Sequence, residues 1–193
     1  MNEQWSDSDL LAALRRREER AFVVLFESYS DPVFRLAAGL LGDEAEAEGV
    51  VQETFLRLFE RLEQFEGRSS LSTWLYRVAY NKSIDLLRRR RVTISLDDTP
   101  DDEEMVAPTI LADWRAGPEI LLSEAEMTAA LEQAIAALPE KYRAIFLLRE
   151  VEGMTTEETA VITNLSISTV KVRLHRARLF LRERLAESFA ALA

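Results

Sequence analysis

The chain has 193 residues, of which 48% are hydrophobic and 30% are charged, a composition typical of a folded globular protein rather than a disordered one. It contains no cysteine, which excludes disulfides, thiolate metal sites and cysteine nucleophiles. The formal net charge of −10 is unusual for a nucleic-acid-binding protein, so the distribution of charge along the chain matters more than its sum.

Glycine and proline are scarce, with 6 and 5 residues, and no segment alternates polar and apolar residues as a half-buried strand would. The sequence therefore predicts an all-α fold: two small helical domains joined by an acidic linker, with a helix-turn-helix in the C-terminal domain. No apolar run approaches the roughly 20 residues that span a bilayer, and the N-terminus lacks the basic and apolar regions of a signal peptide. We therefore expect a cytoplasmic protein without membrane insertion.

The titratable side chains do not indicate an enzyme. The single histidine, His175, lies among arginines and has no carboxylate pair beside it, which makes it a poor metal ligand or general base. Carboxylates are plentiful, but they fall on polar helix faces and in the linker. We expect no catalytic residue, no metal site and no cofactor.

Residues 7–41 have helical periodicity, and Pro32 after Asp31 predicts that a new helix begins there, because proline is tolerated in a first helical turn. Residues 44–65 follow as one long amphipathic helix with a polar face of mixed charge, a pattern that by itself indicates only solvation. Gly49 within it costs roughly 1 kcal/mol relative to alanine, which indicates either a close packing approach or a weak point. The apolar side of this helix consists of Val50, Val51, Thr54, Phe55, Leu58, Phe59 and Leu62.

A further helix, predicted over 71–91 and capped by Ser70 or Ser72, combines aromatic and basic residues. Rings that stack on bases, beside cations that hold phosphates, are typical of proteins that bind single-stranded nucleic acid. The alternative is that the aromatic rings belong to the hydrophobic core and that the arginines form a solvated helix end. We expect this alternative to hold for some of these residues, because the apolar residues of the same helix must be buried. The residues concerned are Trp74, Tyr76, Tyr80, Lys82, Arg88, Arg89, Arg90 and Arg91.

Residues 93–122 differ in character from the rest, with eight acidic residues against Arg115 and with three prolines. This composition predicts an extended, flexible acidic linker. It divides the chain into a domain of residues 1–92 and a domain of residues 123–193. Its negative charge is either solubilising or a mimic of nucleic acid in a basic channel.

Local signals near the C-terminus predict a helix, a tight turn and a second helix. Thr155 and Glu158 form a capping box at the start of the first helix. Asn164 suits the left-handed conformation at a helix end, and Ser166 is a good N-cap for the helix that follows. The apolar residues of this second helix share one face, namely Ile167, Val170, Leu174, Ala177 and Leu181.

The outer face of this second helix is basic. Residues 168–184 contain six basic residues and one acidic residue, and residues 82–91 contain five basic residues and one acidic residue, so the rest of the chain is strongly acidic. A short helix, a turn and a longer helix with a basic outer face is the geometry that enters the major groove of DNA. A hairpin with a solvated basic face is the alternative, but the caps, the turn residue and the apolar register all favour DNA binding.

Four stretches of the chain resemble, in order and spacing, those of bacterial RNA polymerase sigma factors of the extracytoplasmic-function group of the sigma-70 family. They are Val51-Gln-Glu-Thr-Phe55, residues 65–79 with Asn81, Leu138-Pro-Glu-Lys-Tyr-Arg143 and residues 152–178. The resemblance covers nearly the whole chain. It implies a protein that is no enzyme, binds core RNA polymerase and directs it to specific promoters in a stress or envelope response.

The resemblance also implies three functional surfaces. The polar face of helix 44–65 would dock on the clamp helices of the largest polymerase subunit, through Glu48, Val51, Gln52, Glu53, Phe55, Leu56, Arg57 and Glu60. The loop before residue 71 and the aromatic helix would capture a flipped base of the minus-ten element and hold its phosphates, through Gly67, Arg68, Ser69, Ser70, Leu71, Trp74, Tyr80, Asn81, Lys82, Arg88, Arg89, Arg90 and Arg91. The helix-turn-helix would read the minus-thirty-five element, through Thr155, Thr156, Ser166, Ser168, Thr169, Lys171, Val172, Arg173, His175, Arg176 and Arg178.

The implied partners are core RNA polymerase, through its clamp helices and its flap, and promoter DNA. Many members of this family are held inactive by an anti-sigma factor, although no residue of this chain identifies one. Members often have an acidic residue in place of Gly49, and a glycine and a serine in place of Ser168 and Val172.

The alternative to a sigma factor is an ordinary helix-turn-helix regulator that binds a palindromic operator alone, usually as a dimer. A protein that reads duplex DNA needs no aromatic residues to trap an unstacked base, so the aromatic and basic helix over 71–91 disfavours this alternative.

Overall fold

The computed structural model describes residues 5–65, 67, 69–94 and 124–192, which form helices and short connections with no strand among them. The all-α prediction is confirmed. Most of the linker predicted over 93–122 lies outside the described residues. In chain order the elements are α1 (Asp7–Arg15), α2 (Glu19–Leu41), α3 (Glu44–Arg61), the 3-10 turn η1 (Leu62–Gln64), α4 (Leu71–Ile94), α5 (Glu124–Ala136), α6 (Glu140–Phe146), the π-helical turn η3 (Leu147–Val151), α7 (Thr156–Thr163) and α8 (Ile167–Leu192).

Short polar side chains fix where several of these helices begin. The Asp43 side chain accepts a hydrogen bond from the backbone N–H of Glu46 at the start of α3. Ser70 accepts one from the N–H of Thr73 at the start of α4, so of the two predicted caps it is Ser70 that caps this helix. Gly42 ends α2 in the left-handed conformation, with φ of 64°, which glycine adopts without steric cost.

Pro32 does not begin a new helix, and that prediction was wrong. Helix α2 continues through Pro32 without interruption. A proline inside a helix costs about 3 kcal/mol, since it removes a hydrogen bond and crowds the preceding turn. Leu25 on one side and Val33 and Leu36 on the other are fully buried in the same core. Burial of each such side chain contributes about 1.5–3 kcal/mol, so the continuous buried face outweighs the cost of the proline.

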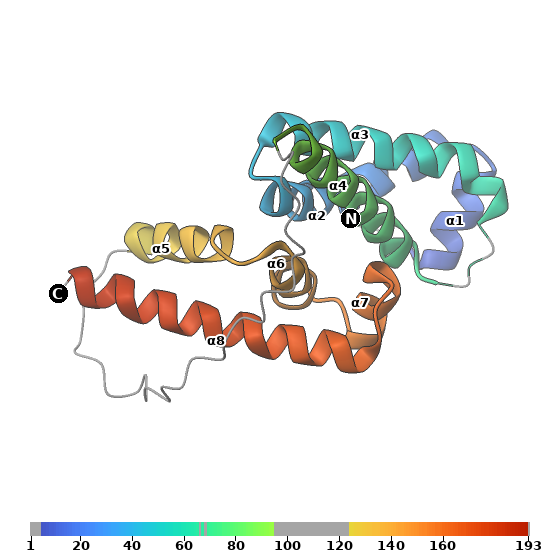
Figure 1. Cartoon of the computed structure of the whole chain (residues 1–193). Helices are drawn as coiled ribbons and strands as arrows, with labels where there is room; N and C mark the ends of the chain where they lie inside the picture. The colour runs from blue at the N-terminus through green and yellow to red at the C-terminus, as the bar shows by residue number, and fades with distance from the viewer. Residues whose placement is uncertain (1–4, 66, 68, 95–123, 193) are drawn as a thin grey trace.

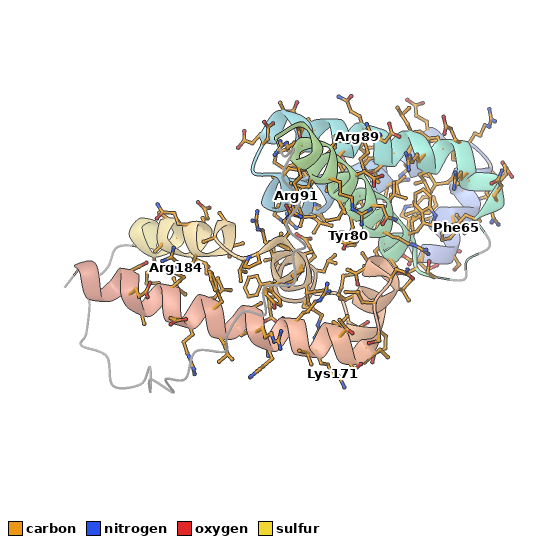
Figure 2. All side chains as sticks on the ribbon, viewed as in Figure 1. Phe65, Tyr80, Arg89, Arg91, Lys171 and Arg184 are labelled. Atoms are coloured by element: carbon orange, nitrogen blue, oxygen red, sulfur yellow. The ribbon has the colours of Figure 1, made fainter. Side chains whose placement is uncertain are left out.

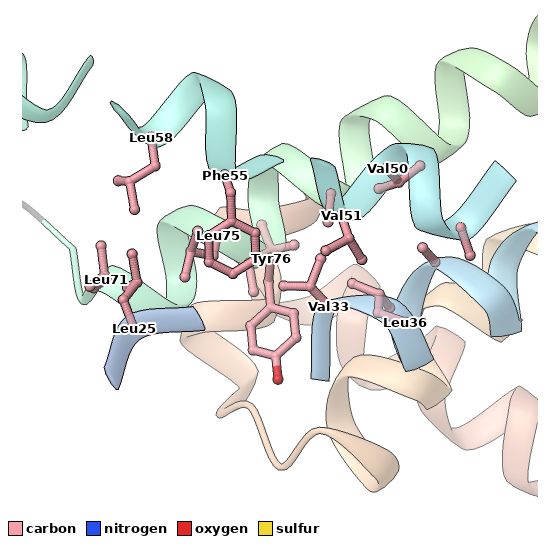
Figure 3. Packing of buried hydrophobic residues seen from close by; sticks show 14 of the residues in the cluster. Leu25, Val33, Leu36, Val50, Val51, Phe55, Leu58, Leu71, Leu75 and Tyr76 are labelled. Atoms are coloured by element: carbon pink, nitrogen blue, oxygen red, sulfur yellow. The ribbon is translucent and has the colours of Figure 1, made fainter. Parts of the chain in front are cut away.

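Helices α1 to α4 pack into an N-terminal bundle (blue to green in Figure 1) around the larger hydrophobic core. Figure 3 shows Phe55 and Val51 of α3 within this core, with Leu75 and Tyr76 of α4 beside them. The hydroxyl group of Tyr76 points out of the cluster. The bundle thus presents α4 with one face buried and the other available for contacts.

Helices α5 to α8 form a C-terminal unit (yellow to red in Figure 1) with smaller cores of its own. Their members come from all four helices and are Ala134, Leu138, Tyr142, Ile145, Ala160, Val170, Leu174, Ala177 and Leu181. The unit also shares the larger core, because Leu147, Leu148 and Ile162 are buried together with residues of the N-terminal bundle. Helix α7 lies directly against α4. Within the part of the chain that the structure describes, no helix is both long enough and apolar enough to cross a membrane.

Candidate nucleic-acid interface

The start of α7 has the predicted capping box. Thr155 Oγ1 accepts a hydrogen bond from the N–H of Glu158 (3.1 Å), and Glu158 Oε2 accepts one from the N–H of Thr155 (2.8 Å). The backbone N–H of Thr155, followed by its hydroxyl, lowers the pKa of the Glu158 carboxyl below its ordinary value. Thr155 is exposed and Thr156 half-buried at the start of this helix, where a DNA backbone could approach their hydroxyls.

The turn between α7 and α8 also matches its prediction. Asn164 ends α7 in the left-handed conformation with φ of 56°. Ser166 Oγ accepts a hydrogen bond from the N–H of Thr169 (3.1 Å) and contacts the hydroxyls of Ser168 and Thr169, both at 2.8 Å. These local hydrogen bonds fix the direction in which α8 leaves the turn.

Helix α8 buries four of its five predicted apolar residues, namely Val170, Leu174, Ala177 and Leu181. The fifth, Ile167, is 43% exposed, and its prediction was wrong because the first residue of the helix precedes the packed segment. Figure 2 shows Lys171 on the side of α8 that faces away from the N-terminal bundle. The exposed residues on this outer surface, which we call the α8 outer face, are Ser168, Lys171, Val172, His175 and Arg178. Arg178 lies at its edge, paired with Glu150 at 2.7 Å.

Arg173 and Arg176 are half-buried on one flank of α8 rather than in the centre of its outer face. They line an open hollow of about 300 Å³ between α8 and the start of α6, together with Lys141, Tyr142, Ser168, Thr169 and Val172. Arg176 Nη1 donates a hydrogen bond to the Tyr142 hydroxyl (3.3 Å), and the Lys141 ammonium lies 5.4 Å from the Tyr142 ring centroid. Three cations and three hydroxyls around one hollow fit a phosphate group.

Sequence reasoning missed Lys141 as part of this surface. A possible signal was its position directly after Pro139 and Glu140, in the first turn of a helix of the same unit. The sequence does not predict that this turn lies beside Arg173 and Arg176. Their proximity arises from the packing of α6 against α8.

The predicted minus-ten residues on α4 divide between surface and interior. Asn81, Arg88 and Arg89 are exposed. Trp74 is half-buried and stacks edge-on against Phe65, with ring centroids 6.4 Å apart. These positions leave one polar amide, two guanidinium groups and part of an indole at the surface of α4.

Tyr80 and Lys82 of α4 are half-buried. Burial raises the pKa of the Tyr80 hydroxyl, against the opposing effect of the Arg173 and Arg88 guanidinium groups nearby. Lys82 lies 3.9 Å from a carboxylate oxygen of Glu53. Tyr80 is therefore close to the C-terminal unit as well as to the arginines of its own helix.

The four arginines at the end of α4 do not share one face. Arg90 donates a hydrogen bond to the Leu41 carbonyl (2.9 Å) and pairs with Glu46 (2.7 Å) and Asp43 (3.8 Å), which holds the corner between α2 and α3. Successive helical residues are rotated by about 100°, so the Arg90 side chain serves that corner in this structure, and its role in holding DNA phosphates stays a prediction. Arg91 pairs with Glu140 of α6 at 3.2 Å.

The loop before α4 contributes a second correction. Leu71 is only 2% exposed and belongs to the larger core, so its assignment to the DNA surface was wrong. Ser69 and Ser70 are half-buried, and the Ser70 hydroxyl serves as the helix cap. Gly67 is exposed with φ of 68°, and Arg68 lies outside the described residues.

On α3, Val51 and Phe55 are buried in the larger core, with 9% and 4% exposure, so their assignment to the polymerase-binding face was wrong. Their side chains lie on the opposite side of the helix from the polar residues. Glu53 and Arg57 are half-buried and paired with each other at 2.8 Å. The remaining predicted residues line one exposed strip, namely Glu48, Gln52, Leu56 and Glu60.

The structure adds an apolar patch beside this strip. Leu56 and Phe59 of α3 are 58% and 46% exposed, and Val23 and Phe26 of α2 are 48% and 53% exposed. Phe59 was assigned to the buried side of α3 from its spacing alone, but it packs edge-on against Phe22 at the rim of the bundle. We call Gln52, Leu56, Phe59, Phe26 and Val23 the α2–α3 patch. Gly49, close to it, has open space around it, so it is a weak point rather than a close approach.

Among the described residues, no group of three or more histidine, aspartate or glutamate side chains is arranged to hold a metal ion. Three surfaces carry the residues with candidate roles: the α8 outer face with its flanking hollow, the exposed part of α4, and the α2–α3 patch.

Comparison with known proteins agrees with the division into two helical units. The model of sigma-70 region 2 matches residues 25–93, and that of sigma-70 region 4 matches residues 128–181. The chain is 32% identical over 176 residues to the ECF RNA polymerase sigma factor SigW of Bacillus subtilis, covering 90% of this chain and 94% of that protein. It is 33% identical over 176 residues to the RNA polymerase sigma-H factor of Pseudomonas aeruginosa, covering 91% of each.

Among solved structures, the sigma factor RpoE of Bartonella quintana, solved in complex with the anti-sigma factor NepR, has a similar fold. Its TM-score is 0.63 at 22% identity, covering 86% of this chain and 96% of that one. The chain therefore belongs to the extracytoplasmic-function group of the sigma-70 family, the sigma factors that bind core RNA polymerase and promoter DNA and initiate transcription at specific promoters without being enzymes.

Proposed function

We propose that this sigma factor acts in the cytoplasm in a stress or envelope response, and that it reads its promoters through two separate surfaces. Residues 1–92 recognise and help to melt the minus-ten element, and residues 123–193 recognise the minus-thirty-five element. The observation that carries this proposal is the capped helix-turn-helix with a basic outer face on α8. Residues 93–122 connect the two.

For the minus-thirty-five element, the α8 outer face enters the major groove. Lys171, Val172 and His175 reach base edges from its centre, and Arg176 does so from the flank. Lys141 and Arg173 hold a backbone phosphate in the hollow beside α6, with the Thr169 hydroxyl as a further donor. Arg178 contacts the backbone on the opposite flank.

For the minus-ten element, Asn81 and the exposed part of Trp74 and Tyr80 capture an unstacked base, while Arg88 and Arg89 hold phosphates. Opening about ten base steps loses on the order of 14 kcal/mol of stacking. Stacking of one captured base on an aromatic ring returns only about 1–3 kcal/mol. Promoter melting therefore draws on contacts with the polymerase, and α4 selects and traps the bases.

For the polymerase, the α2–α3 patch supplies the apolar centre of a docking surface, and Glu48, Glu53, Arg57 and Glu60 supply its polar rim. We assign the clamp helices of the largest subunit to this surface and the flap to the C-terminal unit. The B. quintana RpoE was solved with an anti-sigma factor, and we propose an anti-sigma factor as a further partner here.

Two substitutions beside the same hollow test the assignment on α8. Arg176→Ala should weaken binding of the holoenzyme to its promoter by about 1–3 kcal/mol and relax the preference at one base position, because it removes a base contact. Lys141→Gln should weaken binding to all promoters alike and reduce the slope of log K against log salt by about 1, because it removes one phosphate contact. Both are measured by filter binding over a salt series.

The control for both is Arg184→Gln on the same helix, since Arg184 pairs with Glu187 far from the turn. It should leave affinity and salt slope unchanged. Identical binding curves for Arg176→Ala and the parent would remove α8 from the minus-thirty-five contact.

A further inference from the structure

Val172 is the one apolar residue among the five exposed residues of the α8 outer face. It is 51% exposed, although a valine side chain gains free energy by leaving water. The other four residues, Ser168, Lys171, His175 and Arg178, are polar or charged. Single apolar residues are common on protein surfaces, so the role of Val172 has to be inferred from its surroundings.

Val172 lies in a row of residues along α8, with Ser168 one turn before it and Arg176 one turn after it. Residues four positions apart are neighbours on a helix surface. All three residues line the open hollow beside α6, together with the cations Lys141 and Arg173. Val172 therefore lies at the border between the α8 outer face and the hollow to which we assign a DNA phosphate.

Cations surround Val172 in a way that brings DNA against it. Lys171 precedes it on the outer face, Arg176 follows one turn later, and Arg173 lines the hollow beside it. Contacts with phosphates set the register of a protein on the duplex, and contacts with base edges read the sequence. With a phosphate in the hollow and base edges at Lys171 and Arg176, a base edge also lies against Val172.

The shape of the side chain suits a fixed contact. A valine in a helix keeps one χ1 rotamer, because both of its methyl groups branch from Cβ. Helical side chains lean towards the N-terminus, so these methyl groups lie over the turn that contains Ser168. The Ser168 hydroxyl contacts that of Ser166 at 2.8 Å. Val172 thus forms a rigid apolar spot with polar groups around it.

Ile167 is also exposed on α8, but it lies on a different side of the helix. Each helical residue is rotated by about 100° from the last, which places Ile167 about 140° from Val172 around the axis. An apolar contact made by the α8 outer face therefore involves Val172.

The major groove offers an isopropyl group one favourable partner. Thymine presents a 5-methyl group there, and the edges of the other bases are distinguished by hydrogen-bond donors and acceptors. A valine side chain can donate and accept no hydrogen bond. Against a polar base edge it would displace water without replacing its hydrogen bonds, whereas against a methyl group it removes apolar surface from water.

We propose that Val172 is a specificity-determining residue that selects thymine, through its 5-methyl group, at one position of the minus-thirty-five element. This inference rests on the proposed role of α8 in reading that element. The chemical group recognised is the methyl on carbon 5 of a pyrimidine. 5-Methylcytosine carries the same group, so methylation of a cytosine at that position should strengthen binding.

The position is found by selection. Holoenzyme assembled from core RNA polymerase of the source bacterium selects DNA from a library randomised over the minus-thirty-five element. The parent should enrich thymine at one position that Val172→Ala no longer enriches. Alanine favours the helix more than valine does, so this exposed substitution preserves α8. Arg176→Ala, selected in parallel, should relax a different position.

The methyl group itself is tested by replacing each thymine of the selected element, one at a time, with uracil. Uracil keeps every hydrogen-bonding group and lacks only the methyl. At the Val172 position the parent should bind about fourfold more weakly, which corresponds to about 0.8 kcal/mol for one buried group of this size. Val172→Ala should bind both DNAs more nearly equally. Replacing cytosine with 5-methylcytosine there should strengthen binding of the parent by the same factor.

The matched control is Val161→Ala, because Val161 of α7 is a valine with a similar exposure of 48%. It should keep both the thymine preference and the uracil effect of the parent. Equal binding of thymine and uracil at every position, or a uracil effect that persists undiminished in Val172→Ala, would overturn the inference. If Arg176→Ala still alters the selected sequence, the role of α8 stands without it. If neither variant alters that sequence, both are wrong.

Discussion

Asn81 is an exposed amide on α4 directly after the half-buried ring of Tyr80. Its proposed role is to hold a base only after that base has left the helix, so it contributes to the open complex and not to duplex binding. We expect Asn81→Ala to leave the DNase footprint of the holoenzyme largely intact. Open-complex occupancy, measured by permanganate reactivity, should fall by about five- to 150-fold, which corresponds to the loss of about 1–3 kcal/mol.

Gln64→Ala on η1 is the control, since this exposed residue belongs to none of the three surfaces. It should match the parent in both assays. Equal permanganate reactivity in Asn81→Ala and the parent would contradict the base-capture role.

The partners of individual charged residues could not be predicted from the sequence. The four arginines of α4 were predicted as one phosphate-binding group, but Arg90 closes the α2–α3 corner and Arg91 pairs with Glu140. Lys141 was not predicted at all, yet it lies beside Arg176. A cation can be identified from sequence, but its partner across the fold depends on tertiary packing that no local signal contains.

The first turn of α7 makes a prediction about pH. The pKa of Glu158 is lowered in the folded state, so its stabilising effect is fully present above the ordinary value of 4.5 and is lost as pH falls through the lower folded pKa. Glu158→Gln keeps the shape of the capping box without the charge. The parent should exceed it in stability by about 0.3–1 kcal/mol at pH 7, because a carboxylate is favourable at a helix N-terminus.

The difference should shrink when both proteins are unfolded by urea near pH 3.5. Glu157 is an exposed glutamate one residue earlier in the same helical turn. The variant Glu157→Gln therefore measures the effect of removing a first-turn charge without removing the capping hydrogen bond. A gap between parent and Glu158→Gln that does not change between pH 7 and pH 3.5 would contradict the assignment of the pKa shift to the capping box.

Whole elements were predictable where local chemistry decides them. The helix-turn-helix was predicted down to its caps, because the capping hydrogen bonds of Thr155, Glu158 and Ser166 join residues only three positions apart. Elements decided by burial were less predictable. Helix α2 continues through Pro32, and Phe59 is exposed despite its apolar spacing, because the packing partners of α2 and α3 override both local signals.

The same limit applies to the functional surfaces. Val51, Phe55 and Leu71 lie within stretches that resemble the family, yet their side chains fill the core. A resemblance of sequence includes residues that support a surface as well as residues that form it. Only burial in the folded chain separates the two groups.

The complete molecule places two basic surfaces on an acidic body with a net charge of −10. Such a charge distribution disfavours binding of the free protein to DNA. We therefore expect its activity to depend on core polymerase, whose contacts provide most of the energy for melting. We propose the α2–α3 patch as the surface at which core polymerase docks.

Run-off transcription tests this account most directly: core RNA polymerase of the source bacterium transcribes sheared genomic DNA with and without the chain. The account predicts discrete transcripts that depend on the chain and are lost with Leu56→Glu, because a charge in the α2–α3 patch disrupts polymerase docking while this exposed position tolerates it in the fold. The absence of any chain-dependent transcript, or transcripts that persist unchanged with Leu56→Glu, would contradict it.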